Sequence, residues 1–216
     1  MKLLQVSDIH GSVEMANRVA EMASKGFDAV LAAGDITHFG NTAQAEDILG
    51  RIGRAGVPVY FVAGNCDPEI LLSWRPRLEN VFNIHLGREK LGGLELLGLG
   101  GGNTSPFNTI IEFTEDQFKD MLASLNPSGR AILVSHTPPY GTAADFARGR
   151  HLGSKAIREY VERAKPLAVC CGHIHEGRAV DSIGATKVVN AGPAKDGYCA
   201  SISFSHDRLE VSLLRL

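Results

Sequence analysis

The amino-acid sequence predicts an α/β fold, because short apolar runs alternate along the chain with segments of helical period. The apolar runs are rich in Val, Ile and Leu, and their continuous apolarity is typical of strands buried on both faces. They cover residues 2–6, 29–33, 57–63, 131–134 and 167–171. This alternation favours a parallel sheet with helices packed on its face.

Apolar residues at helical spacing predict a helix in four segments between these strands. The first two stripes end just before Gly26 and Gly56, which favours a helix C-terminus at each point. The third segment begins at Thr114, which forms a capping-box pattern with Gln117, and the fourth begins at Ser154. The stripes consist of Val13, Ala16, Val19, Ala20 and Ala23; Ile48, Leu49, Ile52 and Ala55; Phe118, Met121, Leu122 and Leu125; and Ile157, Tyr160, Val161 and Ala164.

The C-terminal stretch has a different pattern. Strands are expected at residues 187–190, 198–204 and 209–214, with a turn around His206, Asp207 and Arg208, and a further strand at residues 94–99. The two patterns together predict two sheets, one largely parallel and one with antiparallel hairpins. No internal repeat, low-complexity tract or linker-like run divides the sequence, so we expect a single domain of residues 1–216.

Charge and composition exclude several function classes. The 22 Lys and Arg residues against 24 Asp and Glu residues give a net charge of −2, which offers no broad electrostatic footprint for nucleic acid or an anionic membrane. No run approaches the roughly 18 apolar residues that span a bilayer, and Asp8 interrupts the N-terminal apolar run before a signal-peptide core could form. Four cysteines without C-x-x-C spacing favour free thiols in a reducing, cytoplasmic setting. Nucleic-acid and membrane partners are therefore not expected, while a homo-oligomer stays open.

A side chain able to bind a metal follows each of the five buried strands. These residues are Asp8 and His10, Asp35, Asn65, His136, and His173 and His175. Ligands of open α/β sheets bind beyond the carboxyl ends of the strands, so we expect these side chains to converge. The pairs Asp8 with His10 and His173 with His175 are spaced two residues apart, which on extended backbone points both side chains the same way.

The predicted donor set is suited to two transition-metal ions. Carboxylate oxygens, imidazole nitrogens and an amide oxygen suit Mn²⁺, Fe, Zn²⁺, Co²⁺ or Ni²⁺ better than Ca²⁺ or Mg²⁺ alone. Seven ligands exceed what one ion takes from protein while keeping open positions, whereas two ions that share a carboxylate use them all.

The ordered blocks Asp8-x-His10, Gly34-Asp35, Gly64-Asn65, Ser135-His136 and Gly172-His173-x-His175 resemble the calcineurin-like metallophosphoesterase family over about residues 1–195. The resemblance implies a four-layer α/β/β/α sandwich of two mixed β-sheets flanked by helices. It also implies one metal ion held by Asp8, His10, Asp35 and His175, and a second held by Asp35, Asn65, His136 and His173. Asp35 would bridge the two ions.

The sequence departs from the commonest family pattern in its third block. Many members have G-N-H-E there, with the His thought to protonate the leaving group, whereas this chain has Cys66 and Asp67. A neutral thiol is a weak hydrogen-bond donor, so the usual acid is missing. Phe39 stands where Ser/Thr protein phosphatases have a phosphate-binding Arg, which argues against a protein phosphatase. The chain more closely resembles small prokaryotic phosphoesterases of the G-N-C-D type and relatives of cyclic-nucleotide phosphodiesterases.

Other polar residues have expected roles around this centre. We expect His151 or His38 to supply the missing proton or a phosphate contact, with a position of His151 in solvent as the alternative. Ser154 begins a helix whose free amides could bind the phosphate, although it could equally be a simple cap. Asn108 is expected to line the pocket with Phe107 and Thr109.

Several further residues are expected to stay outside the chemistry. The Gly-rich residues 98–103 fail the dinucleotide-binding pattern and indicate a flexible loop beside the site. Cys170 and Cys171 are expected to be small buried hydrophobes. A structural role is favoured for Cys66, with a catalytic thiol as the alternative. His85 and His206 are expected to be ordinary surface or strand residues.

The sequence thus predicts a dinuclear metal-dependent phosphoesterase that hydrolyses phosphodiesters, nucleotides or cyclic nucleotides among them. Attack by a metal-bridging hydroxide is the expected reaction, with two divalent ions per chain, Mn²⁺ first among them. His136 and Asn65 would face the phosphate of a small-molecule phosphoester substrate. The alternative is a metal-binding scaffold without significant turnover, as in the family's retromer member. A nuclease would need a basic groove or an added domain, and the sequence shows neither.

Overall fold

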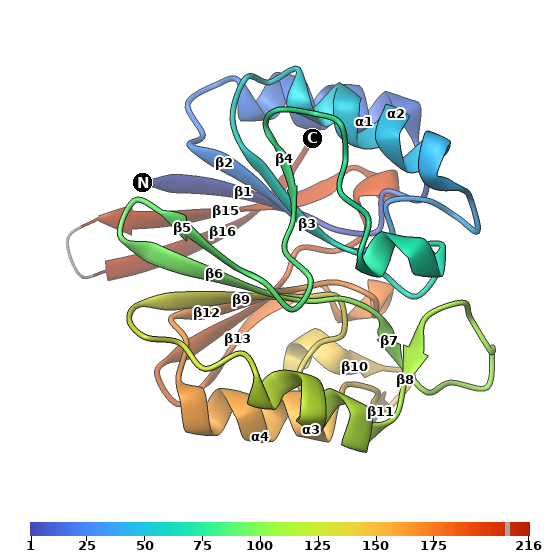
Figure 1. The fold of residues 1–216 in the computed structure, drawn as a ribbon. Helices are drawn as coiled ribbons and strands as arrows, with labels where there is room; N and C mark the ends of the chain where they lie inside the picture. The colour runs from blue at the N-terminus through green and yellow to red at the C-terminus, as the bar shows by residue number, and fades with distance from the viewer. Residues whose placement is uncertain (206–207) are drawn as a thin grey trace.

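Two six-stranded sheets pack face to face in the computed structural model, which describes residues 1–205 and 208–216 (Figure 1). Helices α1 (Val13–Ala23) and α2 (Thr42–Gly53) cover the outer face of one sheet. Helices α3 (Glu115–Ala123) and α4 (Lys155–Ala164) cover the outer face of the other. The predicted four-layer α/β/β/α sandwich is therefore confirmed.

The first sheet has the strand order β16-β15-β1-β2-β3-β4. Its parallel part consists of β1 (Lys2–Val6), β2 (Ala29–Ala33), β3 (Val59–Val62) and β4 (Val81–Asn83). The hairpin of β15 (Tyr198–Ser205) and β16 (Arg208–Arg215) adds to it by antiparallel pairing of β15 with β1. The expected turn residues His206 and Asp207 lie outside the described residues.

The second sheet has the strand order β13-β14-β12-β9-β6-β5. Its parallel part consists of β6 (Leu94–Leu99), β9 (Ala131–Ser135), β12 (Ala168–Cys171) and β14 (Thr186–Asn190). The edge strands β5 (Arg88–Leu91) and β13 (Ala179–Ile183) are antiparallel to their neighbours. Both sheets are thus mixed, and the expectation of one parallel sheet and one hairpin sheet is wrong, because the antiparallel strands are shared between the edges of both.

Short elements lie in the connections. They are the paired strands β7 (Gly102–Asn103) and β8 (Glu112–Phe113), the paired strands β10 (Phe146–Ala147) and β11 (Arg150–His151), and the 3-10 turns η1 (Glu69–Leu72), η2 (Ala143–Asp145), η3 (His175–Gly177) and η4 (Ala194–Asp196). Residues 104–111, between β7 and β8, extend outward from the two sheets (Figure 1).

The strands form a core on both of their faces because alternate side chains point to opposite sides. On β1, Leu3 packs between the two sheets and Leu4 packs under α1 and α2. On β12, Cys170 packs between the sheets, whereas Cys171 packs toward α3 and α4. Both are therefore buried free thiols in the core, as predicted.

Side-chain caps begin the helices as the sequence predicts. Thr114 and Gln117 form both hydrogen bonds of the capping box at α3. In α1, however, the first helical residue Val13 is 42% exposed, and Met15 is buried in its place. Ser12 caps this helix, and the helix rotation that follows turns Val13 away from the sheet.

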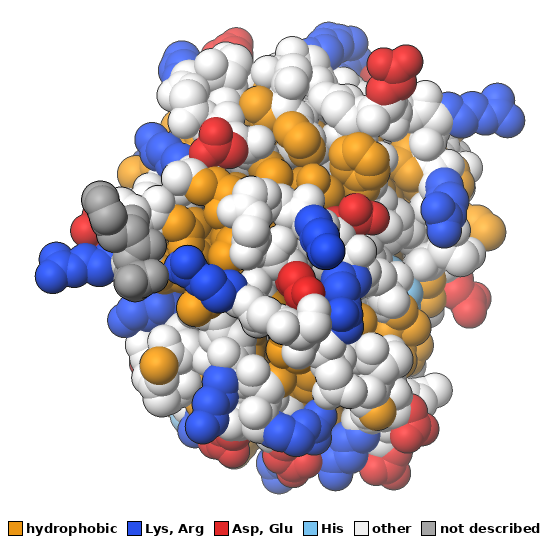
Figure 2. Space-filling model, turned by 60° about the vertical axis from the view of Figure 1, so that its left-hand side comes forward, with side chains coloured by type: hydrophobic (Ala, Val, Ile, Leu, Met, Phe, Trp, Pro, Cys, Tyr) orange, Lys and Arg blue, Asp and Glu red, His pale blue; other side chains and the backbone are white. Residues whose placement is uncertain are grey.

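The described residues include no helix that is both long and apolar enough to cross a membrane. On the face shown in Figure 2, Lys and Arg side chains are interspersed with Asp and Glu.

Glu115 joins the two helices of the second sheet. Its carboxylate accepts hydrogen bonds from Ser154 Oγ at 2.9 Å, from the Lys155 amide at 3.2 Å and from the Ala156 amide at 2.7 Å. An acidic side chain at a helix N-terminus satisfies amides that lack partners within the helix.

Replacing Glu115 by Ala should lower the free energy of unfolding by about 2 kcal/mol, because three donors to a charged acceptor lose their partner. Urea denaturation measures this change. Glu14→Ala is the matched control, since Glu14 is paired only with exposed Arg18, and we expect a loss below about 0.5 kcal/mol. Equal losses from the two substitutions would contradict a stabilising role for the hydrogen bonds between Glu115 and the start of α4.

Candidate metal centre

The loops that follow five parallel strands meet at one edge of the two sheets. Asp8 and His10 follow β1, Asp35 follows β2, and Asn65 follows β3. From the other sheet, His136 follows β9, and His173 and His175 follow β12. Backbone hydrogen bonds join neighbouring loops, including Asp8 N to Gly34 O at 3.0 Å and His136 N to Leu99 O at 3.0 Å.

The backbone at this edge is left-handed at four of the expected ligands. The φ angles are 55° at Asp8, 50° at His10, 51° at Asp35 and 66° at His173. Non-glycine residues adopt such angles at a cost and cluster at functional sites. The expectation that extended backbone aligns the paired ligands is therefore wrong, because tight turns bring them together.

One group of donors surrounds His10 and His175. The Nε2 atoms of these two imidazoles lie 3.4 Å apart. Asp8 Oδ1 lies 3.3 Å from His175 Nε2 and 3.9 Å from His10 Nε2. Asp35 Oδ2 is 3.7 Å from His10 Nε2. The donor atoms of Asp8, His10 and His175 thus lie within 4.8 Å of one another, and Asp35 adjoins this group through His10.

A second group surrounds His136. Its Nε2 lies 3.6 Å from Asp35 Oδ1 and 2.8 Å from Asn65 Oδ1, and its ring centroid lies 5.0 Å from that of His173. The two oxygens of Asp35 therefore face different groups. The Cys66 amide donates to Asp35 Oδ1 at 2.8 Å and fixes the orientation of this carboxylate.

The hydrogen bonds of His136 show that the second group fits a cation. The carbonyl of Ala33 lies 2.8 Å from Nδ1, so Nδ1 carries the proton and donates it. In the neutral form of the ring, Nε2 presents a lone pair beside the Asn65 carbonyl oxygen, and both atoms could then be ligands of one cation. Without a cation, the lone pairs of His136 Nε2 and Asn65 Oδ1 would repel each other. Histidines that bind a metal through one ring nitrogen typically donate a hydrogen bond from the other, as Nδ1 does here to Ala33 O.

Burial sets the protonation of the imidazoles and carboxylates. It lowers the pKa of His10 to about 4 and that of His173 to about 3, so both rings are neutral near pH 7, the form that binds metal ions. Burial also raises the pKa of Asp35 to about 7. For Asp8, burial is outweighed by the hydrogen bond from His175, and the pKa is lowered.

Two glycines are required by the close approach of these loops. A Cβ on Gly34 would lie 2.3 Å from His136 Nδ1, and one on Gly64 would lie 2.1 Å from Asp35 Oδ1. Gly34 also has a φ of 88°, which only glycine adopts without strain.

Asp67 is a buried residue of this region that the sequence did not identify. Its carboxylate accepts hydrogen bonds from the Gly64 amide at 2.8 Å, the Ile36 amide at 3.1 Å, and both the amide and the hydroxyl of Thr37 at 2.7 and 2.8 Å. It thereby joins the loop that holds Asp35 to the loop that holds Asn65. The one feature of the sequence that could have identified Asp67 is its place directly after Cys66, within the block that contains Asn65.

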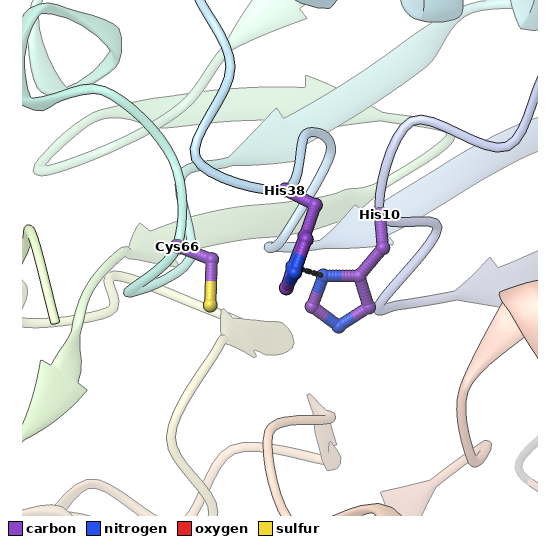
Figure 3. A group of neighbouring side chains, drawn as sticks. All are labelled: His10, His38 and Cys66. Atoms are coloured by element: carbon purple, nitrogen blue, oxygen red, sulfur yellow. Dashed lines mark hydrogen bonds between the residues drawn. The ribbon is translucent and has the colours of Figure 1, made fainter. Parts of the chain in front are cut away.

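His38 lies between Cys66 and His10 (Figure 3). Its Nδ1 is 3.3 Å from His10 Nδ1, and the donor atoms of the three residues lie within 4.8 Å of one another. Burial raises the pKa of the Cys66 thiol well above its usual range, so the thiol stays protonated. His38 is exposed, so it lies at the mouth of the centre.

His151 is held by a buried carboxylate at a distance from these groups in the chain. Its Nδ1 lies 2.8 Å from Asp145 Oδ1, and its ring contacts those of Tyr140 and Phe146. The substrate contact expected of the neighbouring Ser154 does not fit its position. Ser154 is fully buried, caps α4 and donates to Glu115, which also occupies the helix amides that were expected to bind phosphate.

Two loops were expected beside the site, one around Asn108 and one at the Gly-rich residues 98–103. Asn108 is exposed in the projecting loop, beside Phe107, which is 79% exposed, and Thr109 donates to Glu112. The Gly-rich residues 98–103 lie beside Asn65 and His173, but their amides are hydrogen-bonded to neighbouring strands and to His85, so they do not form the expected flexible loop. His85 is therefore a structural acceptor, with a pKa that burial lowers to about 4.

The comparison with known proteins agrees with this geometry. Residues 1–177 match the family model of calcineurin-like phosphoesterases. The chain is 37% identical over 201 residues to an uncharacterized protein of Methanocaldococcus jannaschii, covering 89% of this chain and 88% of that protein.

Two solved structures share the fold at low sequence identity. The protein TT1561 of Thermus thermophilus has a TM-score of 0.76 at 18% identity, with 98% of this chain and 97% of that chain covered. A dimetal phosphatase from Danio rerio has a TM-score of 0.70 at 15% identity, with 99% and 95% covered. These likenesses concern the fold alone. On the family match over residues 1–177 and the related archaeal sequence, the chain belongs to the calcineurin-like phosphoesterase family.

Proposed function

We propose that this chain is a dinuclear metal-dependent phosphodiesterase of the G-N-C-D type. The observation that carries the proposal is the position of Asp35, whose two carboxylate oxygens face different donor groups, at 3.7 Å from His10 Nε2 and 3.6 Å from His136 Nε2. A carboxylate so placed is suited to bridging two ions.

Seven residues would hold the two cations. Asp8, His10, Asp35 and His175 would bind one ion, and Asp35, Asn65, His136 and His173 the other. When bound, the cations supply Lewis-acid chemistry that activates water near neutral pH and neutralises charge on the phosphoryl oxygens. Mn²⁺ is the ion we propose first, with Fe, Zn²⁺, Ni²⁺ and Co²⁺ as alternatives that the donor set also suits.

The remaining residues orient the centre and the substrate. Ala33 fixes the tautomer of His136, and the Cys66 amide fixes Asp35. Asn65 and His136, both buried, would face the substrate phosphate across the proposed metal ions. Because the Cys66 thiol is a poor proton donor, substrates whose leaving group needs little protonation are favoured.

His38 is the better placed of the two candidate proton donors. It contacts His10, a proposed ligand, and its exposed ring is next to Cys66, where many relatives have a His. If the His10 Nδ1 proton is shared with His38 Nδ1, the Nε2–H of His38 is free to donate to a leaving-group oxygen. His151 lies on another segment, and its Nδ1 is engaged by Asp145.

Loading metal-free protein with Mn²⁺ should produce hydrolysis of bis(4-nitrophenyl) phosphate, and Asp35→Asn should lower that rate by about 100-fold or more. Metal analysis should show about two ions per wild-type chain and fewer in the variant. Asp47→Asn is the matched control, because Asp47 is exposed on α2 and paired with Arg51. Full turnover by Asp35→Asn contradicts the proposal, and two bound ions without turnover on any ester would favour the metal-binding scaffold.

The same enzyme should prefer diesters and activated monoesters over alkyl phosphomonoesters, because no strong acid stands at the position of Cys66. Comparing kcat/KM for bis(4-nitrophenyl) phosphate, 4-nitrophenyl phosphate and a simple alkyl phosphate measures this order. An alkyl monoester as the best substrate would show that the proposed specificity is wrong.

His38→Ala should lower kcat for a diester with an alkyl leaving group by about 10- to 100-fold while changing the 4-nitrophenyl ester rate by less than about three-fold. His151→Ala is expected to affect both esters by a similar factor. Metal content should be unchanged in both variants. If His38→Ala hydrolyses the alkyl ester at the wild-type rate, His38 is not the proton donor.

A further inference from the structure

Three neighbouring rings in residues 139–154 have no part in the proposed bond cleavage. Tyr140 is 37% exposed and Phe146 is 45% exposed, although both are large and hydrophobic. The ring of His151 packs against both, with centroids 5.5 Å from Tyr140 and 5.1 Å from Phe146. The rings are inclined to one another at 59° and 64°, so a planar ligand would stack on one of them at a time. We call these three side chains the aromatic platform. Contiguous exposed rings of this kind mark a binding surface more often than a structural one.

A buried carboxylate holds this platform in one arrangement. Asp145 is fully buried, and its oxygens accept hydrogen bonds from the amides of Gly141 at 3.1 Å, Thr142 at 2.8 Å and Gly153 at 2.9 Å. The fourth partner is His151 Nδ1 at 2.8 Å. The central ring is thus fixed before any ligand binds, which lowers the entropy cost of binding.

The platform is attached directly to the loop that carries two proposed metal ligands. The Asn190 side-chain amide donates to Ala144 O at 3.0 Å, in the turn η2, and to Ile174 O at 2.8 Å, between His173 and His175. Arg148 Nε lies 3.7 Å from Glu176 Oε1, one residue beyond His175. The segment that carries the platform therefore lies beside the loop that carries His173 and His175.

Positive charge surrounds the rings. Arg148, Arg150 and Lys155 are exposed on the same segment, and Lys155 Nζ lies 5.4 Å from the centroid of Tyr140. Two acidic side chains also face this segment: Glu176 pairs with Arg148, and Asp181 accepts a hydrogen bond from the Ala143 amide at 2.7 Å. Rings combined with cations suit a flat, electron-rich group that is joined to phosphate, whereas an alkyl chain would gain nothing from the charges.

We propose that Tyr140, Phe146 and His151 form a base-binding subsite, and that the substrates are phosphodiesters of nucleosides, with the base stacked on the platform and the phosphate at the metal centre. This inference rests on the proposed function, since it names the substrate class of the same site. It assigns recognition to residues 139–154 and leaves the bond cleavage to the strand-end loops.

Binding of two product-like probes to the Mn²⁺-loaded protein tests the subsite. Isothermal titration calorimetry compares adenosine 5′-monophosphate with ribose 5-phosphate, which has the same phosphate and sugar but no base. Stacking of a base contributes about a ten-fold gain in affinity or more, so wild type should bind the nucleotide at least about ten-fold more tightly. In Tyr140→Ala and Phe146→Ala that ratio should fall below about three, with the affinity for ribose 5-phosphate little changed.

Phe82→Ala is the matched control, because Phe82 is also an aromatic residue that is 37% exposed, but it lies on the edge strand β4 and stacks on Tyr60. The control should keep the wild-type ratio. Circular dichroism and metal content of each variant identify any loss of folding, and Tyr140→Phe should restore the ratio, since it keeps a ring.

The possible results separate the subsite from the proposed reaction. If wild type hydrolyses nitrophenyl esters but binds both probes equally, the subsite is wrong and the phosphodiesterase stands. If the base preference depends on Tyr140 but no ester is hydrolysed, the subsite stands and the reaction is wrong. Equal loss of affinity for both probes in Tyr140→Ala would also overturn the inference, since the residue would not then recognise the base.

Discussion

The carboxylate of Asp67 is the interaction on which the geometry of the centre depends. It lies beneath the metal-binding loops, fully buried, and collects three backbone amides and a hydroxyl from the loops after β2 and β3. Those amides have no strand partners at that point, and burying them unpaired would cost about 1–3 kcal/mol each. One side chain therefore satisfies the ends of two strands and sets the separation of Asp35 from Asn65.

The metal centre combines two unfavourable features, a strained backbone at several ligands and polar side chains that are buried. Left-handed residues such as Asp8 and His173 cost conformational energy, and the imidazoles lie 3.3–3.9 Å from buried carboxylates, an arrangement suited to holding cations. The surrounding sheets supply the stability that keeps these loops in place. By contrast, recognition of the organic part of a substrate is left to residues 139–154, whose own buried carboxylate at Asp145 makes them a separately organised unit.

The α/β class and the convergence of the seven donors at one edge could be predicted because both follow from local patterns. The four layers were implied by the family resemblance, and the local patterns divided the strands wrongly between the sheets. Strand ends meet wherever parallel strands are neighbours, and a capping box such as that of Thr114 involves residues three apart. Features that depend on distant pairs could not be predicted. The edge to which the last hairpin attaches depends on pairs such as Lys2 with Ser203, and the burial of Ser154 depends on Glu115. The left-handed turns at Asp8 and His10 likewise follow from packing against Asp35 and its loop rather than from residue type.

The glycines of the proposed metal-binding loops make these loops much less tolerant of substitution than the exposed aromatic residues. Gly34 and Gly64 leave no space for even one methyl group against His136 and Asp35. A larger residue at either position would therefore disturb both the folding of the loop and the arrangement of the proposed ligands. Phe107, Tyr140 and Phe146 project from the surface and can be exchanged at little cost in stability. Across descendants of this sequence, the reaction is thus expected to persist while the preferred substrate diverges, and new specificities can arise without re-optimising the catalytic loops.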